Sequence, residues 1–194
     1  NTLTASVCEG TIPSVNMTLT QGAAPVVVDY SYNGITYTEI IGIVGQVAPI
    51  TVNIPLDITN LNIGANTITI LSVIDYSGDP SPNTLIPTPV VITVHPTPVV
   101  TFATTTPEIC FGQPAILEFG FLVGTAPFNV DYTINALPQT PLPFNANGTQ
   151  TYILTPDPAP GVNTYNMIQV TDDWGCQSII NATAPVTITV NPTP

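Results

Sequence analysis

The chain has 194 residues, no lysine or arginine, and twelve aspartates and glutamates, which give a formal net charge of −12 at pH 7. Because nucleic acids, anionic lipids and phosphate groups are held mainly by cationic side chains, this composition excludes nucleic acid as a partner and removes every lysine- or arginine-based phosphate clamp. Hydrophobic residues make up 44% of the chain, but no apolar run reaches the roughly 20 residues of a transmembrane helix. We therefore expect no direct membrane insertion and an acidic, extracellular protein.

The sequence repeats itself. Gly22 to Tyr30 recurs as Gly124 to Tyr132, and the segment Val94 to Pro98 recurs at the end of the chain, where Asn191 replaces His95. This repeat predicts two tandem modules, residues 1–98 and 99–194, joined by a short proline-rich linker of semi-rigid geometry. Since the chain ends on the Pro-Thr-Pro that also separates the modules, we expect it to be a part of a longer array.

Apolar and polar residues alternate along short segments of both modules, which predicts half-buried antiparallel strands. In chain order, these segments are residues 15–19, 26–32, 90–94, 117–123, 128–134 and 186–190. Prolines are scattered throughout and no stretch keeps a 3.6-residue apolar period, so helix is not expected. About seven short strands in each module favour an all-β fold of two tandem immunoglobulin-like β-sandwich repeats, with a barrel as the alternative.

Three cysteines allow one disulfide within the chain. Cys110 opens the second module and Cys176 follows a turn near its end. If the last hairpin packs beside the first strands, the two meet, and we predict a Cys110–Cys176 disulfide, with two buried thiols as the alternative. Cys8 aligns with Cys110 but has no second cysteine in its own module, so it is predicted to be a free thiol or to pair outside this segment.

Catalytic residues are not expected. His95 is the only histidine, and a catalytic triad or a metal centre needs several groups that converge. Glycoside cleavage by paired carboxylates is disfavoured because the acids are spread out and, apart from Asp29 with Asp131 and Asp75 with Asp172, do not recur between the modules. The sequence therefore predicts that the protein is not an enzyme and has no cofactor other than Ca²⁺.

A Ca²⁺ site is one interpretation of Asp172, Asp173 and Asp157, whose carboxylates would act with loop carbonyls. The favoured interpretation is a turn in which aspartate caps its own backbone. At the same turn, Trp174 in the second module and Tyr76 in the first are aromatic. We expect them to pack at the junction between modules, and stacking on a sugar ring is the alternative.

These motifs together resemble the repeats of giant Bacteroidetes cell-surface proteins, which include gliding-motility adhesins of the SprB type. The resemblance rests on Cys110-Phe111-Gly112, Gly124-Thr125-Ala126-Pro127, the run Val170 to Cys176 and the run Val186 to Pro194, and it covers the second module almost end to end. The first module departs from it by lacking the second cysteine.

The resemblance implies export by the type IX secretion system and display at the cell surface. It further implies a structural or adhesive repeat of a large adhesin, in gliding motility or surface attachment, whose partners are neighbouring repeats of the same chain and surface polysaccharide. Two alternatives remain open: a carbohydrate-binding module of a secreted protein, and a subunit of an extracellular fibre that polymerises by strand exchange.

Overall fold

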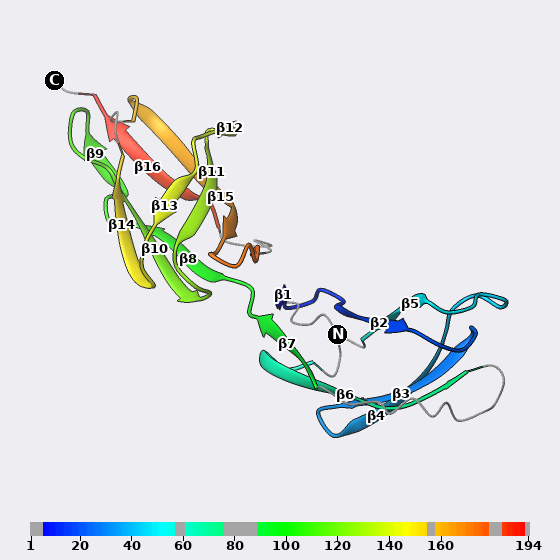
Figure 1. The fold of residues 1–194 in the computed structure, drawn as a ribbon. Coiled ribbons are helices and arrows are strands. Elements are labelled where there is room, and N and C mark those ends of the chain that lie inside the picture. Colours follow the sequence, from blue (N-terminus) through cyan, green and yellow to red (C-terminus); the bar gives the residue numbers. More distant parts are fainter. Residues whose placement is uncertain (1–5, 57–60, 76–88, 155–157, 179–183, 193–194) are drawn as a thin grey trace. The chain divides into compact units, whose positions relative to one another are not determined.

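In the computed structural model, residues 6–56, 61–75, 89–154, 158–178 and 184–192 are described, and every regular element within these ranges is a β-strand (Figure 1). The chain forms two compact units, Asn1–His95 and Pro96–Pro194, here called unit 1 and unit 2. The boundary between them lies three residues before the one expected from the sequence repeat.

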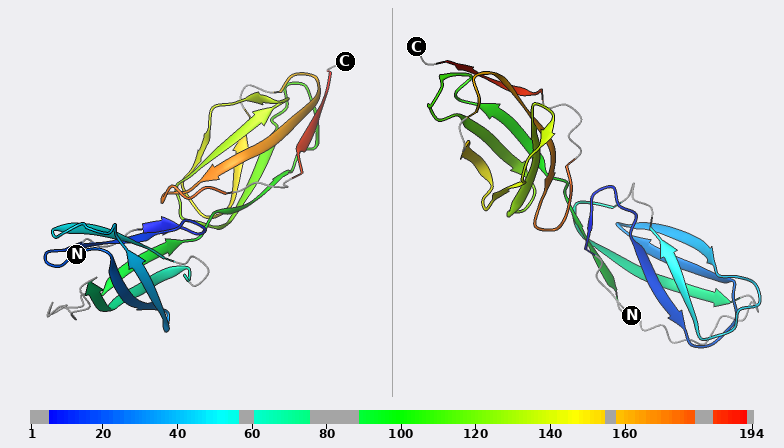
Figure 2. Two further views of the ribbon diagram at one scale, coloured as in Figure 1. Left: turned by 90° about the vertical axis from the view of Figure 1, so that its right-hand side faces the viewer. Right: turned by 90° about the horizontal axis from the view of Figure 1, so that it is seen from above.

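The described residues of unit 1 form seven strands: β1 (Ser6–Cys8), β2 (Ser14–Leu19), β3 (Val26–Tyr32), β4 (Ile35–Ile41), β5 (Ile50–Pro55), β6 (Gly64–Asp75) and β7 (Val90–His95). Its larger sheet has the order β1-β7-β6-β3-β4, and its smaller sheet pairs β2 with β5. The first strand runs parallel to the last, and the other neighbours are antiparallel. The two sheets form the layers of a sandwich (Figure 2).

Unit 2 contains the remaining strands: β8 (Val99–Thr104), β9 (Glu108–Cys110), β10 (Ile116–Val123), β11 (Phe128–Ile134), β12 (Leu137–Pro138), β13 (Leu142–Phe144), β14 (Gly148–Ile153), β15 (Gly161–Thr171) and β16 (Val186–Asn191). Its larger sheet has the order β12-β11-β15-β16-β9, with β13 also paired to β11, and its smaller sheet has the order β14-β10-β8. Again the short strand β9 runs parallel to the last strand, β16. The predicted all-β fold of immunoglobulin-like sandwiches is thus confirmed.

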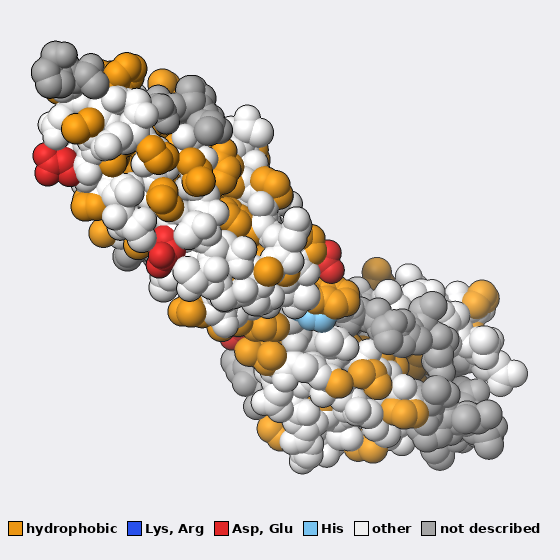
Figure 3. All heavy atoms as spheres, turned by 90° about the vertical axis from the view of Figure 1, so that its left-hand side faces the viewer, with side chains coloured by type: hydrophobic (Ala, Val, Ile, Leu, Met, Phe, Trp, Pro, Cys, Tyr) orange, Lys and Arg blue, Asp and Glu red, His pale blue; other side chains and the backbone are white. Residues whose placement is uncertain are grey.

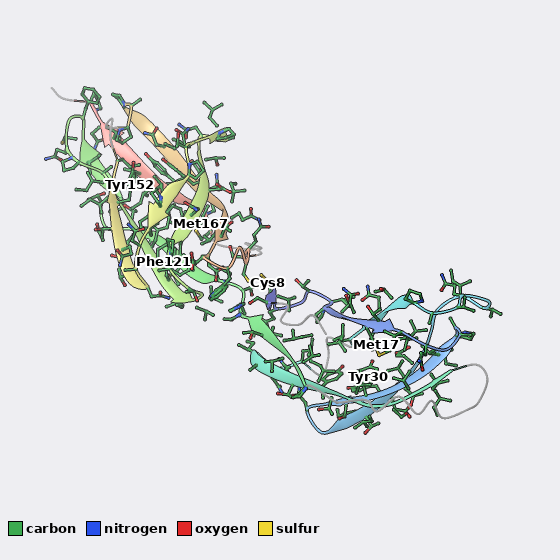
Figure 4. All side chains as sticks on the ribbon, in the orientation of Figure 1. Cys8, Met17, Tyr30, Phe121, Tyr152 and Met167 are labelled. Carbon is green, nitrogen blue, oxygen red and sulfur yellow. The ribbon has the colours of Figure 1, made fainter. Side chains whose placement is uncertain are left out.

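Each unit has its own apolar core, built by the predicted alternation. In unit 1, Val26, Val28, Tyr30 and Tyr32 of β3 are at most 1% exposed, while the residues between them face outward. In unit 2 the side chains of β10 and β11 do the same, and Phe121 packs on Phe128 with ring centroids 4.4 Å apart. Figure 4 shows Phe121, Tyr152 and Met167 within unit 2, and Met17 and Tyr30 between the sheets of unit 1.

The same β-bulge interrupts the central pair of strands in both units. The register between β3 and β6 shifts at Asp29/Tyr30, and that between β11 and β15 shifts at Asp131/Tyr132. The unpaired residues are Leu71 and Ile168, which are 51% and 54% exposed. Because a bulge adds one residue, it reverses the alternation beyond it. The sequence pattern did not reveal this feature.

Candidate functional site

A buried asparagine on the central strand closes one end of the sandwich in unit 1. Asn66 is fully buried on β6 and donates from Nδ2 to the carbonyls of Asn62, at 2.7 Å, and Gly64, at 3.0 Å. Its Oδ1 accepts from the backbone N–H of Asn62 and from Nδ2 of Asn33, both at 2.9 Å. Asn33 sits in the β3–β4 turn with φ of 51°, a conformation that asparagine tolerates better than most residues. The side chain therefore fixes two loops to the sheet.

Unit 2 repeats this arrangement with different neighbours. Asn163 on β15 donates to the carbonyls of Ala159, at 2.8 Å, and Gly161, at 3.4 Å, and accepts from Nδ2 of Asn135, at 3.2 Å. Asn135 occupies the β11–β12 turn with φ of 50°. We call Asn33–Asn66 and Asn135–Asn163 the asparagine pairs. The repeated Gly-x-Asn-Thr sequence was the signal for these residues, but it did not reveal their role.

The two units also make equivalent side-chain contacts where their parallel strands end. In unit 1, the Oγ of Ser6 lies 2.6 Å from Nε2 of His95. In unit 2, Glu108 occupies the place of Ser6, and its carboxylate accepts from Nδ2 of Asn191 at 2.8 Å. The single histidine therefore occupies the position that Asn191 has in unit 2. Each of these residues makes a side-chain contact with the neighbouring parallel strand at the end of the larger sheet.

Asp172 organises the turn between β15 and β16. Its Oδ1 accepts from the backbone N–H groups of Trp174, at 3.0 Å, and Cys176, at 2.9 Å, and its Oδ2 accepts from that of Thr125, at 3.2 Å. The residue is 6% exposed. Both oxygens of this carboxylate thus accept hydrogen bonds from the backbone. This agrees with the favoured interpretation of the sequence, a turn capped by aspartate, rather than with a Ca²⁺ site.

Asp173, the other described residue of the predicted Ca²⁺ site, belongs to no cluster of metal-binding side chains among the described residues. Asp157 lies outside the described residues, and within the described ranges no group of three or more histidine, cysteine, aspartate or glutamate side chains converges. Of the two aromatic residues, Tyr76 also lies outside the described residues, whereas Trp174 is 51% exposed.

The predicted Cys110–Cys176 disulfide is wrong, and so is the predicted free thiol at Cys8. Cys110 is a free, exposed thiol, whereas Cys176 and Cys8 are disulfide-bonded. Cys110 is paired in register with Asn191, next to the first residue of β15, whereas Cys176 follows the last residue of that strand. About ten residues of extended strand, or roughly 30 Å, separate these ends. A disulfide requires Cα atoms within about 7 Å of each other, so the two cysteines of unit 2 cannot meet.

The acidic side chains of the described ranges are dispersed rather than gathered. Figure 3 shows isolated acidic groups among polar and hydrophobic side chains on the visible face. Asp29, on β3, accepts hydrogen bonds from Ser72, at 2.6 Å, and Thr38, at 2.7 Å. These two bonds, with that from Ser72 the stronger influence, lower the pKa of Asp29 below its ordinary value of 3.8. No helix able to cross a bilayer occurs in the segments that the structure describes.

Several solved structures resemble the chain at low sequence identity. One is that of the fibronectin(III)-like modules of Clostridium thermocellum CbhA (13% identity, 98% of this chain and 91% of that chain, TM-score 0.42). Others are a 1.5-MDa bacterial ice-binding adhesin (13%, 97% and 62%, 0.41) and a three-immunoglobulin structure of titin (14%, 100% and 63%, 0.44). No protein-family model and no curated protein sequence matches the chain.

Proposed function

We propose that this chain is a structural and adhesive repeat segment of a large secreted surface protein, of the SprB gliding-motility type, in which it acts as a semi-rigid stalk without catalysis. One observation carries the proposal: the polar side chains that recur in both units form their hydrogen bonds with groups of their own unit. Each asparagine pair joins two side chains of one unit and also binds loop carbonyls. The contacts of Ser6 with His95 and of Glu108 with Asn191 likewise each join two side chains of one unit. What the repeat preserves is therefore the shape of a module.

The disulfide chemistry of the chain fits an extracellular location, and we propose that the protein is exported by the type IX secretion system. Disulfides such as those of Cys8 and Cys176 form and persist in oxidising environments. The absence of lysine and arginine from the sequence leaves no site for trypsin-like proteases. We take residues 1–98 and 99–194 as the repeating modules, whose partners are neighbouring repeats of the same long chain and surface polysaccharide.

The proposal is tested in the source cells. Antibodies raised against the 194-residue segment are expected to label intact cells as strongly as permeabilised ones. In-frame deletion of both modules is expected to shorten the surface fibre while leaving it displayed. Labelling that requires permeabilisation, or loss of an enzymatic activity on deletion, would contradict the stalk function.

A carbohydrate-binding module is the second candidate, and the exposure of Trp174 favours it, since exposed aromatic rings stack on sugars. A glycan array probed with the whole chain tests it. Binding that a Trp174→Ala variant loses and a Phe111→Ala variant keeps would support this function, because Phe111 is a comparably exposed aromatic residue on another turn. No binding to any glycan would remove it.

A further inference from the structure

One loop of unit 1 is longer than its counterpart in unit 2. In unit 1, residues 42–49 join β4 to β5. The corresponding strands of unit 2 are β13 and β14. Ile41 and Phe144 pair with equivalent residues of β3 and β11, and β5 and β14 pair with the equivalent strands β2 and β10. Only residues 145–147 join those two strands. Unit 1 therefore has eight residues where unit 2 has three, and we call residues 42–49 the insertion loop.

Hydrogen bonds hold the backbone of the insertion loop. The N–H of Gln46 donates to the carbonyl of Ile43 at 3.2 Å and closes a turn, and Oε1 of Gln46 accepts from the N–H of Ile43 at 3.3 Å. At the base of the loop, the N–H of Ala24 donates to the carbonyl of Gln46 at 2.8 Å, and that of Ala48 donates to the carbonyl of Gly22 at 3.0 Å. The insertion loop is therefore a closed turn that presents its side chains to solvent.

The side chains that this turn presents are aliphatic. Ile43, Val44 and Val47 are 70%, 73% and 71% exposed, and the sequence from Ile40 to Leu56 contains no charged residue. Turns are usually built from glycine, asparagine, aspartate and serine, and the shorter loop of unit 2 reads Asn-Ala-Asn. The chemistry of a turn therefore does not account for the aliphatic side chains of the insertion loop.

Apolar side chains also occupy the outer face of the larger sheet beside this loop. Ile40, which is as exposed as Val44, pairs in register with Val27, and Val27 pairs on its other side with Ile74. The residue at the centre of the equivalent row in unit 2 is Asn129. We call this row together with the insertion loop the apolar patch. Apolar surfaces of a few hundred Å² on one molecule mark interaction sites.

We propose that the apolar patch binds the same patch on a second copy of the chain, in a symmetric contact. Because the patch carries no charge and its turn is closed by its own hydrogen bonds, two copies pack together without burying an unpaired charge. Sugars are bound by hydrogen bonds and aromatic stacking, which aliphatic side chains do not offer, and the net charge of −12 repels anionic membranes. The inference is independent of the proposed function.

The size and charge of the surfaces determine how this dimer behaves. A stable interface buries about 800 Å² on each partner, and a few aliphatic side chains offer less, so the dimer is weak. Two chains of charge −12 repel each other, and salt screens this repulsion over a Debye length of about 8 Å at 0.15 M. The dimer is therefore expected to strengthen as salt is added, whereas attraction between the acidic chain and a cationic partner would weaken.

Cross-linking between copies tests the proposal. Val44→Cys in a Cys110→Ser background places one reactive thiol in the insertion loop, since Cys8 and Cys176 are disulfide-bonded. Leu137→Cys in the same background is the matched control, because Leu137 is a comparably exposed aliphatic residue of unit 2. Under mild oxidation, we expect disulfide-linked dimers to form at least about tenfold faster from Val44→Cys, since association raises the effective concentration of the two thiols.

Two further measurements identify the occupant. The rate for Val44→Cys is expected to rise between about 0.05 and 0.5 M salt, and adding Ile43→Asn, a neutral change that suits a turn, is expected to lower it to the control rate. Equal rates for the two thiols, or a rate that falls as salt is added, would overturn the proposal. Flotation of the original chain with phosphatidylcholine vesicles, if Ile43→Asn abolishes it, would assign the patch to a lipid surface and overturn a second copy as its occupant.

Discussion

Asn33 donates a hydrogen bond from Nδ2 to Oδ1 of Asn66 at 2.9 Å, and in unit 2 Asn135 donates to Asn163 in the same way at 3.2 Å. Each acceptor lies on the central strand and each donor in a neighbouring turn, so the pair ties a loop to the core. A buried polar side chain is tolerated only when its bonds are satisfied. The asparagine pairs meet this condition in both units.

An Asn66→Ala substitution should therefore destabilise unit 1 selectively. It leaves the Asn62 and Gly64 carbonyls and the Asn33 amide without their partner, and we expect the free energy of unfolding of unit 1 to fall by about 2–3 kcal/mol. Calorimetry of the whole chain measures this change. Asn53→Ala, at an exposed position of β5, is the control and should change stability by less than about 0.5 kcal/mol. Equal effects of both substitutions would contradict the role of the asparagine pair.

Thiol labelling should modify Cys110 alone. Under denaturing, non-reducing conditions we expect one thiol per chain to react with iodoacetamide, since Cys8 and Cys176 are disulfide-bonded. Mass spectrometry after digestion locates the label, with a protease other than trypsin because the chain has no lysine or arginine. Cys110→Ser should reduce the number of reactive thiols to zero. A label on Cys8 in the unmodified chain would refute the assignment.

The strands and the repeat could be predicted from the sequence because both depend on local patterns. The alternation of Val26, Val28, Tyr30 and Tyr32 fixes which face of β3 is buried, and an offset of 102 residues relates it to β11. The turn at Asp172 was also predictable, since aspartate before a glycine-containing turn commonly binds its own backbone.

The cysteine pairing could not be predicted, because it depends on which end of a long strand each cysteine approaches. Cys110 aligns correctly with Cys8, but the sequence does not show that β9 joins β16 beside the start of β15. The bulges at Leu71 and Ile168 could not be predicted for a related reason, because one extra residue in an apolar strand leaves the composition of that strand unchanged. Tertiary register decides both features.

The stability of unit 1 should depend on Asp29 at low pH. Hydrogen bonds from Ser72 and Thr38 hold the pKa of Asp29 below 3.8. A carboxylate with a lowered pKa stabilises the fold above the pKa of the unfolded chain, and this contribution is lost as the pH falls through the folded pKa. The melting temperature of unit 1 should therefore fall below about pH 4, and less steeply in Asp29→Asn. Asp131→Asn is the matched control; an identical pH profile for both variants would contradict this account.

Asp172 should stabilise unit 2 without calcium. Asp172→Ala removes the acceptor of three backbone N–H groups, and we expect a loss of about 3 kcal/mol from the free energy of unfolding of unit 2. Asp173→Ala, at the adjacent exposed position, should have little effect. Thermal unfolding of the unmodified chain should be the same in excess Ca²⁺ and in excess chelator. A rise in melting temperature with Ca²⁺ that Asp172→Ala abolishes would restore the metal site.

Tyr165 should limit the stability of unit 2 at high pH. Its ring is fully buried, its hydroxyl has no hydrogen-bond partner among the described residues, and burial, followed by the charge of Tyr132, raises its pKa to about 12. Because the folded state disfavours the phenolate, the stabilisation is complete below the unfolded pKa of about 10 and is lost as the pH rises toward 12. Tyr165→Phe removes this dependence and also an unpaired buried hydroxyl, so we expect it to raise the stability of unit 2 by about 1 kcal/mol at pH 7. Melting curves between pH 7 and pH 11 measure both effects, with unit 1 as the internal reference. Destabilisation by Tyr165→Phe would show that the hydroxyl has a partner that stabilises the fold.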